Sequence, residues 1–279
     1  MINIPYGRRN VQNTPVSSGL ELTYTSGNAP TKTLAEWNTF FYTSVLATTP
    51  FASFTQTGDV ITLYGATGLT MNTLLFLNSA IIYSVIDYDN EVIGTQASTF
   101  KGSSIVTAIL PACTLIDAEC FRSALSLLTV ECINAITINQ YAFNGCSNLE
   151  TITFPKVVTI GYNVFNNCAK LIIASFPECT SMAGNTFATN VKLTTAYFPK
   201  LITTGANEFY RCYILTSINL GACTNLGGTV ASNNVFYQIS GKIITLTVPH
   251  ALMTCNGGNP DGDIQALQAA NTVTIIYSD

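Results

Sequence analysis

The sequence predicts an α/β solenoid, in which short parallel strands and turns wind into coils that stack on one another. The main observation is a phenylalanine that returns after one interval of 21 residues and then four of 22. A repeat of this length is typical of one structural unit copied and stacked. The markers are Phe100, Phe121, Phe143, Phe165, Phe187 and Phe209. Two other series keep the same step: Pro111, Ile133, Pro155, Pro177, Pro199 and Gly221, and Ile116, Ile138, Ile160, Met182, Thr204 and Leu226.

The residues between two markers predict the shape of a single coil. One copy places Leu149, Ile152 and Phe154 before Pro155, so that apolar residues recur at i, i+3 and i+5. This spacing fits a short strand, a turn and a less regular return path better than it fits a helix or a long strand. Each coil then exposes an apolar side until a neighbour covers it, so several copies are needed for stability. Strands of successive coils are expected to lie parallel, about 4.8 Å apart.

These residues carry a family resemblance. The stretch AFNGCSNLETITFPKVVTIG (142–161) resembles the BspA-like leucine-rich repeat, whose units read roughly A-F-x-x-C-x-x-L-x-x-I-x-L-P-x-x-V-x-x-I. The resemblance covers residues 92–250, with a step one residue shorter than is commonest in such proteins and with Thr204 in an apolar position. A stretched seventh copy has Phe236, 27 residues after Phe209, as its marker.

A solenoid needs caps at both ends of its stack. We expect an extended N-terminal arm in residues 1–30 and an N-terminal cap in residues 31–91. In this cap a helix over 31–47 begins with a capping-box pattern of Thr33 and Glu36. The C-terminal cap, residues 251–279, is expected to hold a helix led by Asp263 and a closing strand over 272–278.

Composition excludes several classes of function. The net charge is −4 and no basic run is present, which argues against a nucleic-acid partner. The longest apolar stretch, 74–86, is too short to span a bilayer, so we expect no membrane insertion. The first residues also lack the apolar segment of a signal peptide.

Structural roles are the preferred interpretation for the residues considered for catalysis and metal binding. The one histidine, His250, has no nucleophile motif beside it. Asp87, Asp89 and Glu91 alternate like the ligands of a hard cation, but they lack the rest of a calcium loop, and a solvated acidic edge is the preferred interpretation. No catalytic residue, metal site or cofactor is therefore predicted. A carbohydrate-active enzyme is kept as a less favoured alternative, with segment 50–90 as the place to search.

Cysteines recur in phase with the repeat. Cys146, Cys168 and Cys212 each follow a marker phenylalanine by three residues, where other copies have Ser103, Ala124 and Asn190. Alternation with other side chains at one repeat position is typical of a buried filler rather than of a nucleophile. We expect free, buried thiols, because parallel stacking seldom gives the torsion that a disulfide requires.

The remaining candidate for function is a surface. Residues between the inward positions of each strand, together with Lys156, Glu178 and Lys200, are expected to form a hydroxyl-rich, weakly charged concave face. Such a face suits recognition of a glycan or a protein by many modest hydrogen bonds around an aromatic anchor. The alternative is that threonine is present only because it favours strands. The predicted binding residues are Thr151, Thr153, Ser175, Thr195, Tyr197, Ser217 and Asn219.

The sequence thus predicts a non-enzymatic recognition or scaffold protein, and the BspA-like resemblance implies adhesion. The favoured context is a phage virion component, such as a fibre, tail-tip or capsid decoration, because no export signal is seen. In this hypothesis the arm contacts other virion proteins and the solenoid binds a host surface protein or glycan. The alternatives are a bacterial BspA-like adhesin and an interaction module. The expected location is the virion or an extracellular surface, and a homo-oligomer is left open.

Overall fold

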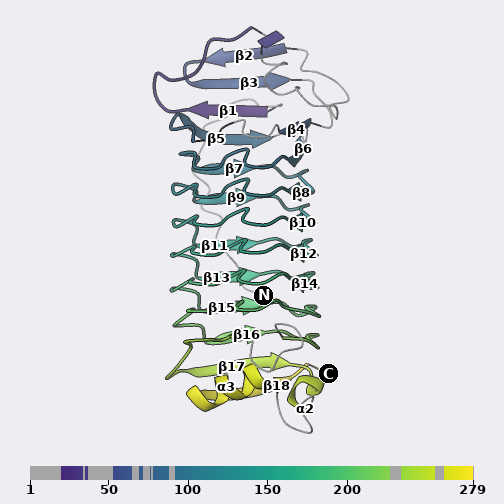
Figure 1. Ribbon diagram of the computed structural model, residues 1–279. Helices are drawn as coiled ribbons and strands as arrows, with labels where there is room; N and C mark the ends of the chain where they lie inside the picture. Colours follow the sequence, from purple (N-terminus) through teal and green to yellow (C-terminus); the bar gives the residue numbers. More distant parts are fainter. Residues whose placement is uncertain are drawn as a thin grey trace, which may run out of the picture.

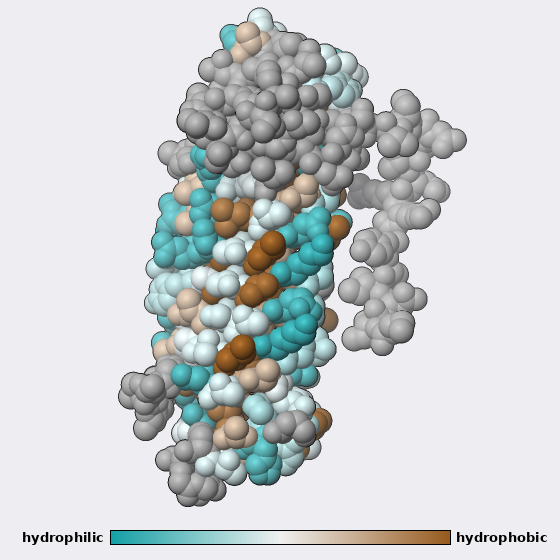
Figure 2. Space-filling view, turned by 90° about the vertical axis from the view of Figure 1, so that its right-hand side faces the viewer, coloured by the Kyte–Doolittle hydropathy of each residue, from teal (hydrophilic) through white to brown (hydrophobic). Residues whose placement is uncertain are grey.

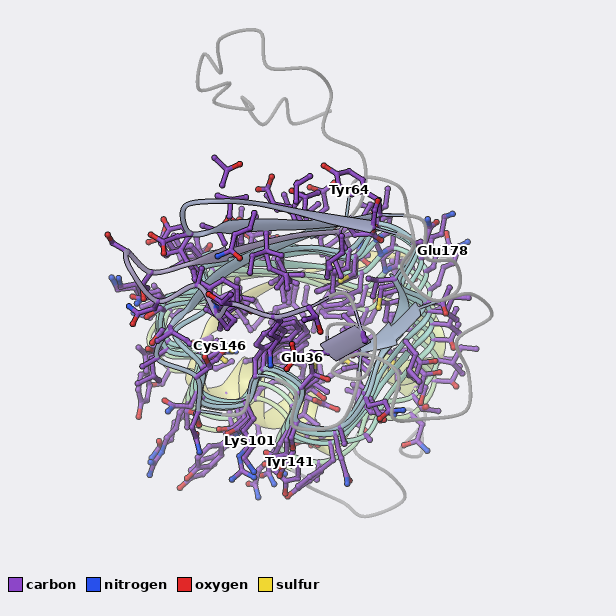
Figure 3. The ribbon with its side chains drawn as sticks, turned by 90° about the horizontal axis from the view of Figure 1, so that it is seen from above. Glu36, Tyr64, Lys101, Tyr141, Cys146 and Glu178 are labelled. Carbon is purple, nitrogen blue, oxygen red and sulfur yellow. The ribbon has the colours of Figure 1, made fainter. Side chains whose placement is uncertain are left out.

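The computed structural model describes residues 20–33, 35–36, 53–64, 69–71, 76, 78–87, 92–226, 234–254 and 261–278. Over these residues the chain winds into a nearly straight column of stacked coils (Figure 1). Viewed along its axis, the coils superpose and their side chains fill the centre (Figure 3). The described strands lie in three sheets of six strands each.

The first sheet begins the stack and changes character along it. Its first four strands in spatial order pair antiparallel, and the pairs that follow β5 are parallel. Its strands, in spatial order, are β2 (Ser53–Thr57), β3 (Val60–Tyr64), β1 (Leu20–Tyr24), β5 (Ile82–Asp87), β7 (Thr107–Ile109) and β9 (Thr129–Glu131).

The second and third sheets run along two sides of the column, and all their strand pairs are parallel. The third sheet continues the side that the first sheet begins (Figure 1). The second sheet holds β4 (Leu69–Met71), β6 (Val92–Thr95), β8 (Leu115–Ile116), β10 (Thr137–Ile138), β12 (Thr159–Ile160) and β14 (Ser181–Met182). The third holds β11 (Thr151–Thr153), β13 (Ile173–Ser175), β15 (Thr195–Tyr197), β16 (Ser217–Asn219), β17 (Ile243–Val248) and β18 (Thr272–Tyr277).

Strand register confirms the period predicted from the sequence. In the second sheet Thr137 pairs with Thr159, which pairs with Ser181, and each partner lies one repeat further along the chain. Residues at one repeat position therefore lie side by side through the stack, and each position becomes a column parallel to the axis.

The marker phenylalanines form one such column in the core. Successive rings stack with centroids 5.0–5.9 Å apart, and these side chains are buried. The column also includes Phe76, whose ring lies 5.2 Å from that of Phe100 and which the repeat count missed. A second row, Phe154, Phe176 and Phe198, stacks at 5.6 and 5.3 Å. Each ring removes a large apolar surface from water and adds a favourable stacking geometry.

Each marker phenylalanine lies in a turn with two left-handed residues. The residues two before and two after the ring have positive φ: Asn163 (56°) and Asn167 (59°) around Phe165, and Asn185 (51°) and Thr189 (61°) around Phe187. Asparagine and glycine adopt this conformation at lower cost than other residues do, which explains why they are frequent at these positions.

The N-terminal end differs from the predicted helical cap. Among the described residues this end of the stack is formed by β1, β2 and β3, which extend the sheet. Of the predicted helix over 31–47, only Ala35 and Glu36 are described as helical. Residues 31–33 are described but not helical, and residues 34 and 37–47 lie outside the described residues. The capping box is present, because the Glu36 carboxylate accepts from the amide nitrogen of Thr33 (2.7 Å) and the Glu36 amide donates to the Thr33 hydroxyl (3.3 Å).

The predicted arm also differs in its last third. Leu20–Tyr24, for which we expected an extended arm, forms β1 between β3 and β5, with Leu20, Leu22 and Tyr24 buried. Residues 1–19 lie outside the described residues.

The C-terminal end confirms the predicted helix and strand. Two helices, α2 (His250–Thr254) and α3 (Gly262–Ala270), precede the closing strand β18. The residue that caps α3 is Asp261 rather than the predicted Asp263, because Asp261 accepts the amide of Asp263 at 2.9 Å. Asp263 is instead buried and accepts the amide of Val235 at 3.2 Å, which ties the helix to the last coil.

Candidate functional site

The predicted binding residues come together on the outer side of the third sheet. In β13 and β15 the middle residue, Ala174 or Ala196, is buried and the two flanking residues are exposed in full or in part. The register aligns these flanking positions with those of β11 and β16 into two rows. One row reads Thr151, Ile173, Thr195 and Ser217, and the other reads Thr153, Ser175, Tyr197 and Asn219. We call these eight positions the third-sheet wall.

The wall differs from the prediction in two respects. It belongs to a nearly straight column, so it is flat rather than concave (Figure 1). It also includes Ile173, which is 38 % exposed and which the predicted set omitted. The apolar side chain stands between Thr151 and Thr195, and it interrupts the row of hydroxyl groups.

Tyr197 is the aromatic group of the wall and is 42 % exposed. It pairs with Ser175 on one side and with Asn219 on the other. The amide oxygen of Asn219 accepts from the backbone nitrogen of Gly221 at 3.0 Å, and this contact fixes its orientation. A half-exposed tyrosine among hydroxyl and amide groups offers both a ring face and hydrogen bonds to a ligand.

The charged residues expected on this face lie beyond the strands instead. Lys156, Glu178 and Lys200 occupy one repeat position, in the turns that follow β11, β13 and β15. Lys200 forms an ion pair with Glu178 at 2.6 Å, and Lys156 donates to the amide oxygen of Asn134 at 2.5 Å. These charged residues lie outside the two rows, so the eight positions of the wall carry no charge. Figure 3 labels one of them, Glu178, at the edge of the column.

The second sheet has a different surface. Ile136, Val158 and Ile202 share one repeat position there and are each exposed by 38–48 %. Figure 2 faces this side and shows apolar side chains following the axis beside polar ones. The sequence analysis did not single out this column, although its period is visible in the sequence.

The residues considered for catalysis occupy structural positions. His250 begins α2, and its ring lies 4.7 Å from that of Tyr277. In segment 50–90, Asp59 accepts the backbone amide of Gly27 (2.9 Å) and Asp87 accepts that of Val92 (2.9 Å). Both carboxylates therefore hold turns of the backbone.

Asp87 also bears on the cation hypothesis. It is 2 % exposed, so it does not contribute to a solvated acidic edge, while Asp89 and Glu91 lie outside the described residues. Among the residues that the structure describes, no group of three or more potential metal ligands occurs. The same residues contain no helix with the length and hydropathy that crossing a membrane requires.

The eight described cysteines are free and buried, as predicted. The thiols of Cys146, Cys168 and Cys212 donate to the carbonyls of Phe121, Phe143 and Phe187, at 3.1–3.2 Å. Burial raises the pKa of each of these thiols. A protonated thiol inside the stack is a weak nucleophile, and its role is to satisfy a buried carbonyl.

One buried carboxylate was missed by the sequence analysis. Glu208 has no exposed surface, and burial raises its pKa to about 7. Its oxygens accept the backbone amides of Thr186 (2.9 Å) and Gly205 (3.1 Å), which favour the ionised form and partly oppose the effect of burial. Glu208 lies between two coils, and its position gives it a role in stability rather than in surface recognition.

Comparisons with known proteins agree with this architecture. The family model described as "BspA type Leucine rich repeat region (6 copies)" matches residues 114–241. A comparison with curated protein sequences finds no match. Among solved structures, a leucine rich repeat protein of T. pallidum is similar, with 18 % identity, coverage of 79 % of this chain and 93 % of that chain, and a TM-score of 0.50.

Two other solved structures align over most of the chain. A leucine rich cell surface protein from Faecalibacterium prausnitzii A2-165 is 13 % identical, with 81 % of this chain and 86 % of that chain covered and a TM-score of 0.30. A leucine-rich repeat protein from Bacteroides ovatus ATCC 8483 is 13 % identical, with coverages of 92 % and 98 % and a TM-score of 0.26. The T. pallidum structure shares the solenoid fold, and the model of the BspA-type leucine-rich repeat matches the part of the chain at residues 114–241.

Proposed function

We propose that this protein is a non-enzymatic recognition protein whose third-sheet wall binds a polar surface, either a glycan or a protein. The observation that carries the proposal is the register of the third sheet. It aligns hydroxyl groups, the Asn219 amide and the half-exposed ring of Tyr197 on one flat, uncharged wall. Flat polar surfaces with an aromatic anchor bind through many modest contacts and suit extended ligands.

The family match favours the adhesin alternative over the virion hypothesis. BspA-type repeats are typically binding modules without enzymatic activity, and the resemblance implies adhesion. None of the proteins named above points to a virion, and we therefore propose an extracellular surface as the setting. Contacts of the N-terminal arm, residues 1–30, with other virion proteins, and a homo-oligomer, remain predictions from the sequence.

Attachment of the purified chain to surfaces tests the proposal. The probes are bacterial cells, immobilised extracellular-matrix proteins and a glycan array. The wall variant carries Thr195→Lys and Tyr197→Ala, which add a charge and remove the aromatic anchor. A matched control carries Thr159→Lys and Tyr162→Ala on and beside the second sheet, where Thr159 and Tyr162 are also exposed.

We expect the wall variant to bind at least roughly tenfold more weakly than the wild type, because loss of a central aromatic contact is commonly that costly. The control should bind like the wild type. Equal binding by both variants, or failure of the wild type to bind any of the probes, would contradict the proposal.

A further inference from the structure

The last coil and helix α3 line a cavity of about 430 Å³ that is open on one side to solvent. Its walls include Phe236 and Tyr237 from the coil and Ala266 and Ala270 from the helix. The volume lies within the range of roughly 300–1,000 Å³ that small-molecule sites occupy. The cavity is separate from the third-sheet wall, so the inference goes beyond the proposed function.

The cavity exists because the stack of aromatic rings ends there. Phe236 stacks on Phe209 with centroids 5.9 Å apart and an interplanar angle of 3°, and it is the last ring of the column. Beyond it the chain places α3 instead of another coil. Ala266 and Ala270 present only methyl groups on the side that faces the cavity, so the space of a further ring remains open.

Hydrogen bonds at both ends of α3 join the helix to the last coil and fix the two sides of the cavity relative to each other. At the start of the helix, the amide of Val235 donates to the carboxylate of Asp263 at 3.2 Å. Near its end, the amide of Gly241 donates to the carbonyl of Ala270, and the side-chain amide of Asn271 donates to the carbonyl of Ile239, both at 2.9 Å. A site with both walls fixed needs little reorganisation on binding, which favours affinity.

Tyr237 supplies an aromatic face to this site. Its ring stacks on Tyr210 with centroids 5.3 Å apart and an interplanar angle of 10°. One face of the ring is therefore covered by Tyr210, and Tyr237 lines the cavity together with Ala266 and Ala270 of α3. The side chain is 48 % exposed, which leaves the ring accessible to a ligand.

The polar groups around the ring define the chemistry of the ligand. Asn234, Gln238 and Ser240 also line the cavity and offer amide and hydroxyl groups. The amide oxygen of Gln238 accepts from Nε of Arg211 at 2.9 Å, so its NH₂ group is turned to other acceptors. Asp263 is the one charged residue among the lining residues, and its carboxylate disfavours an anionic ligand.

We propose that this cavity binds one pyranose ring of a neutral glycan. The less polar face of the sugar packs on Tyr237, and its hydroxyl groups bond to Asn234, Gln238 and Ser240. An aromatic wall with a few convergent polar groups is the general arrangement of small-ligand sites, and a sugar presents the matching combination of one apolar face and many hydroxyl groups.

Titration with defined sugars tests the proposal. The probes are the methyl glycosides of glucose, galactose, mannose and N-acetylglucosamine, each added separately and followed by saturation-transfer NMR. The variant Tyr237→Ala removes the ring, and Ala266→Trp fills the cavity from an exposed helix position. Ala269→Trp adds the same side chain to an exposed position of α3 that does not line the cavity. Circular dichroism checks that each variant is folded.

We expect saturable binding of at least one probe to the wild type and to Ala269→Trp, and a loss of roughly tenfold or more in affinity for Tyr237→Ala and Ala266→Trp. The wall variant with Thr195→Lys and Tyr197→Ala should bind the probe like the wild type, so this result is independent of the proposed function. The proposal is overturned if no probe binds saturably, or if both cavity variants bind as the wild type does.

Discussion

The side-chain amide of Asn190 donates to the carbonyl of Phe165 at 3.0 Å, the same contact that the Cys212 thiol makes with Phe187 one coil further on. Asn190 also accepts the backbone amide of Cys168 at 2.8 Å. One repeat position thus uses either an amide or a thiol to satisfy the carbonyl of a marker phenylalanine. The polar column inside the stack is part of what holds successive coils in register.

Asn190→Ala should therefore destabilise the protein by roughly 3 kcal/mol, because it leaves a buried carbonyl and a buried amide without partners. Asn190→Cys should cost clearly less, since the thiol can repeat the contacts that Cys168 and Cys212 make. Urea unfolding followed by circular dichroism measures both free energies. A smaller loss for alanine than for cysteine would be inconsistent with this role.

Phe165→Ala should cost about 3–5 kcal/mol, because it opens a cavity in the column of marker rings and beside the second row. Phe165 contacts Phe143, Phe154, Phe176 and Phe187, with centroids 5.2–6.2 Å away. Tyr162→Ala, on the exposed surface of the same coil, should cost less than about 1 kcal/mol. Chemical denaturation of the two variants checks the difference, and similar losses would argue against a stacked core.

Exchange of two side chains tests the left-handed turns. Thr189 and Asn167 occupy the same repeat position with φ near +60°, where a β-branched residue is strained. Thr189→Asn should stabilise the protein by about 0.5–1 kcal/mol, and Asn167→Thr should destabilise it by a similar amount. Thermal unfolding of both variants gives the signs, and two changes of the same sign would exclude this explanation.

Glu208 should make stability depend on pH. Because burial raises its pKa from 4.5 to about 7, the folded protein binds this proton more tightly than the unfolded chain does. The free energy of unfolding that protonated Glu208 contributes is fully present below about pH 4.5 and is lost as the pH rises to about 7. The total loss is on the order of 3 kcal/mol.

Glu208→Gln should remove this part of the pH dependence and make the variant more stable than the wild type above pH 7. Unfolding free energies measured at pH 5 and pH 8 for both proteins check the prediction. An equal change between the two pH values in wild type and variant would show that Glu208 does not titrate in this range.

The stack was predictable because one period governs both the sequence and the register. Residues 22 positions apart become neighbours, so the columns of phenylalanine and cysteine could be read before the structure was known. The repeat count missed Phe76 because it lies 24 residues, rather than 22, before Phe100. Its ring still joins the column, with its centroid 5.2 Å from that of Phe100.

The ends were less predictable because they do not repeat. Leu20, Leu22 and Tyr24 alternate as a half-buried strand should, but the polar residues around them suggested an arm. The wall followed from strand alternation, except for Ile173, whose exposure depends on its register rather than on its polarity. The cavity beside Tyr237 could not be predicted, since it depends on how α3 replaces a coil.

Hydroxyl-radical footprinting with mass spectrometry is the most direct measurement of recognition by the third-sheet wall. Tyr197 and Tyr162 are 42 % and 41 % exposed and lie on different sides of the column. Oxidation of Tyr162 therefore serves as the internal control for that of Tyr197. With the protein bound to the surface it recognises, we predict that oxidation of Tyr197 falls while that of Tyr162 is unchanged. Protection of Tyr162 alone, or unchanged oxidation of Tyr197 in the bound protein, would contradict the account.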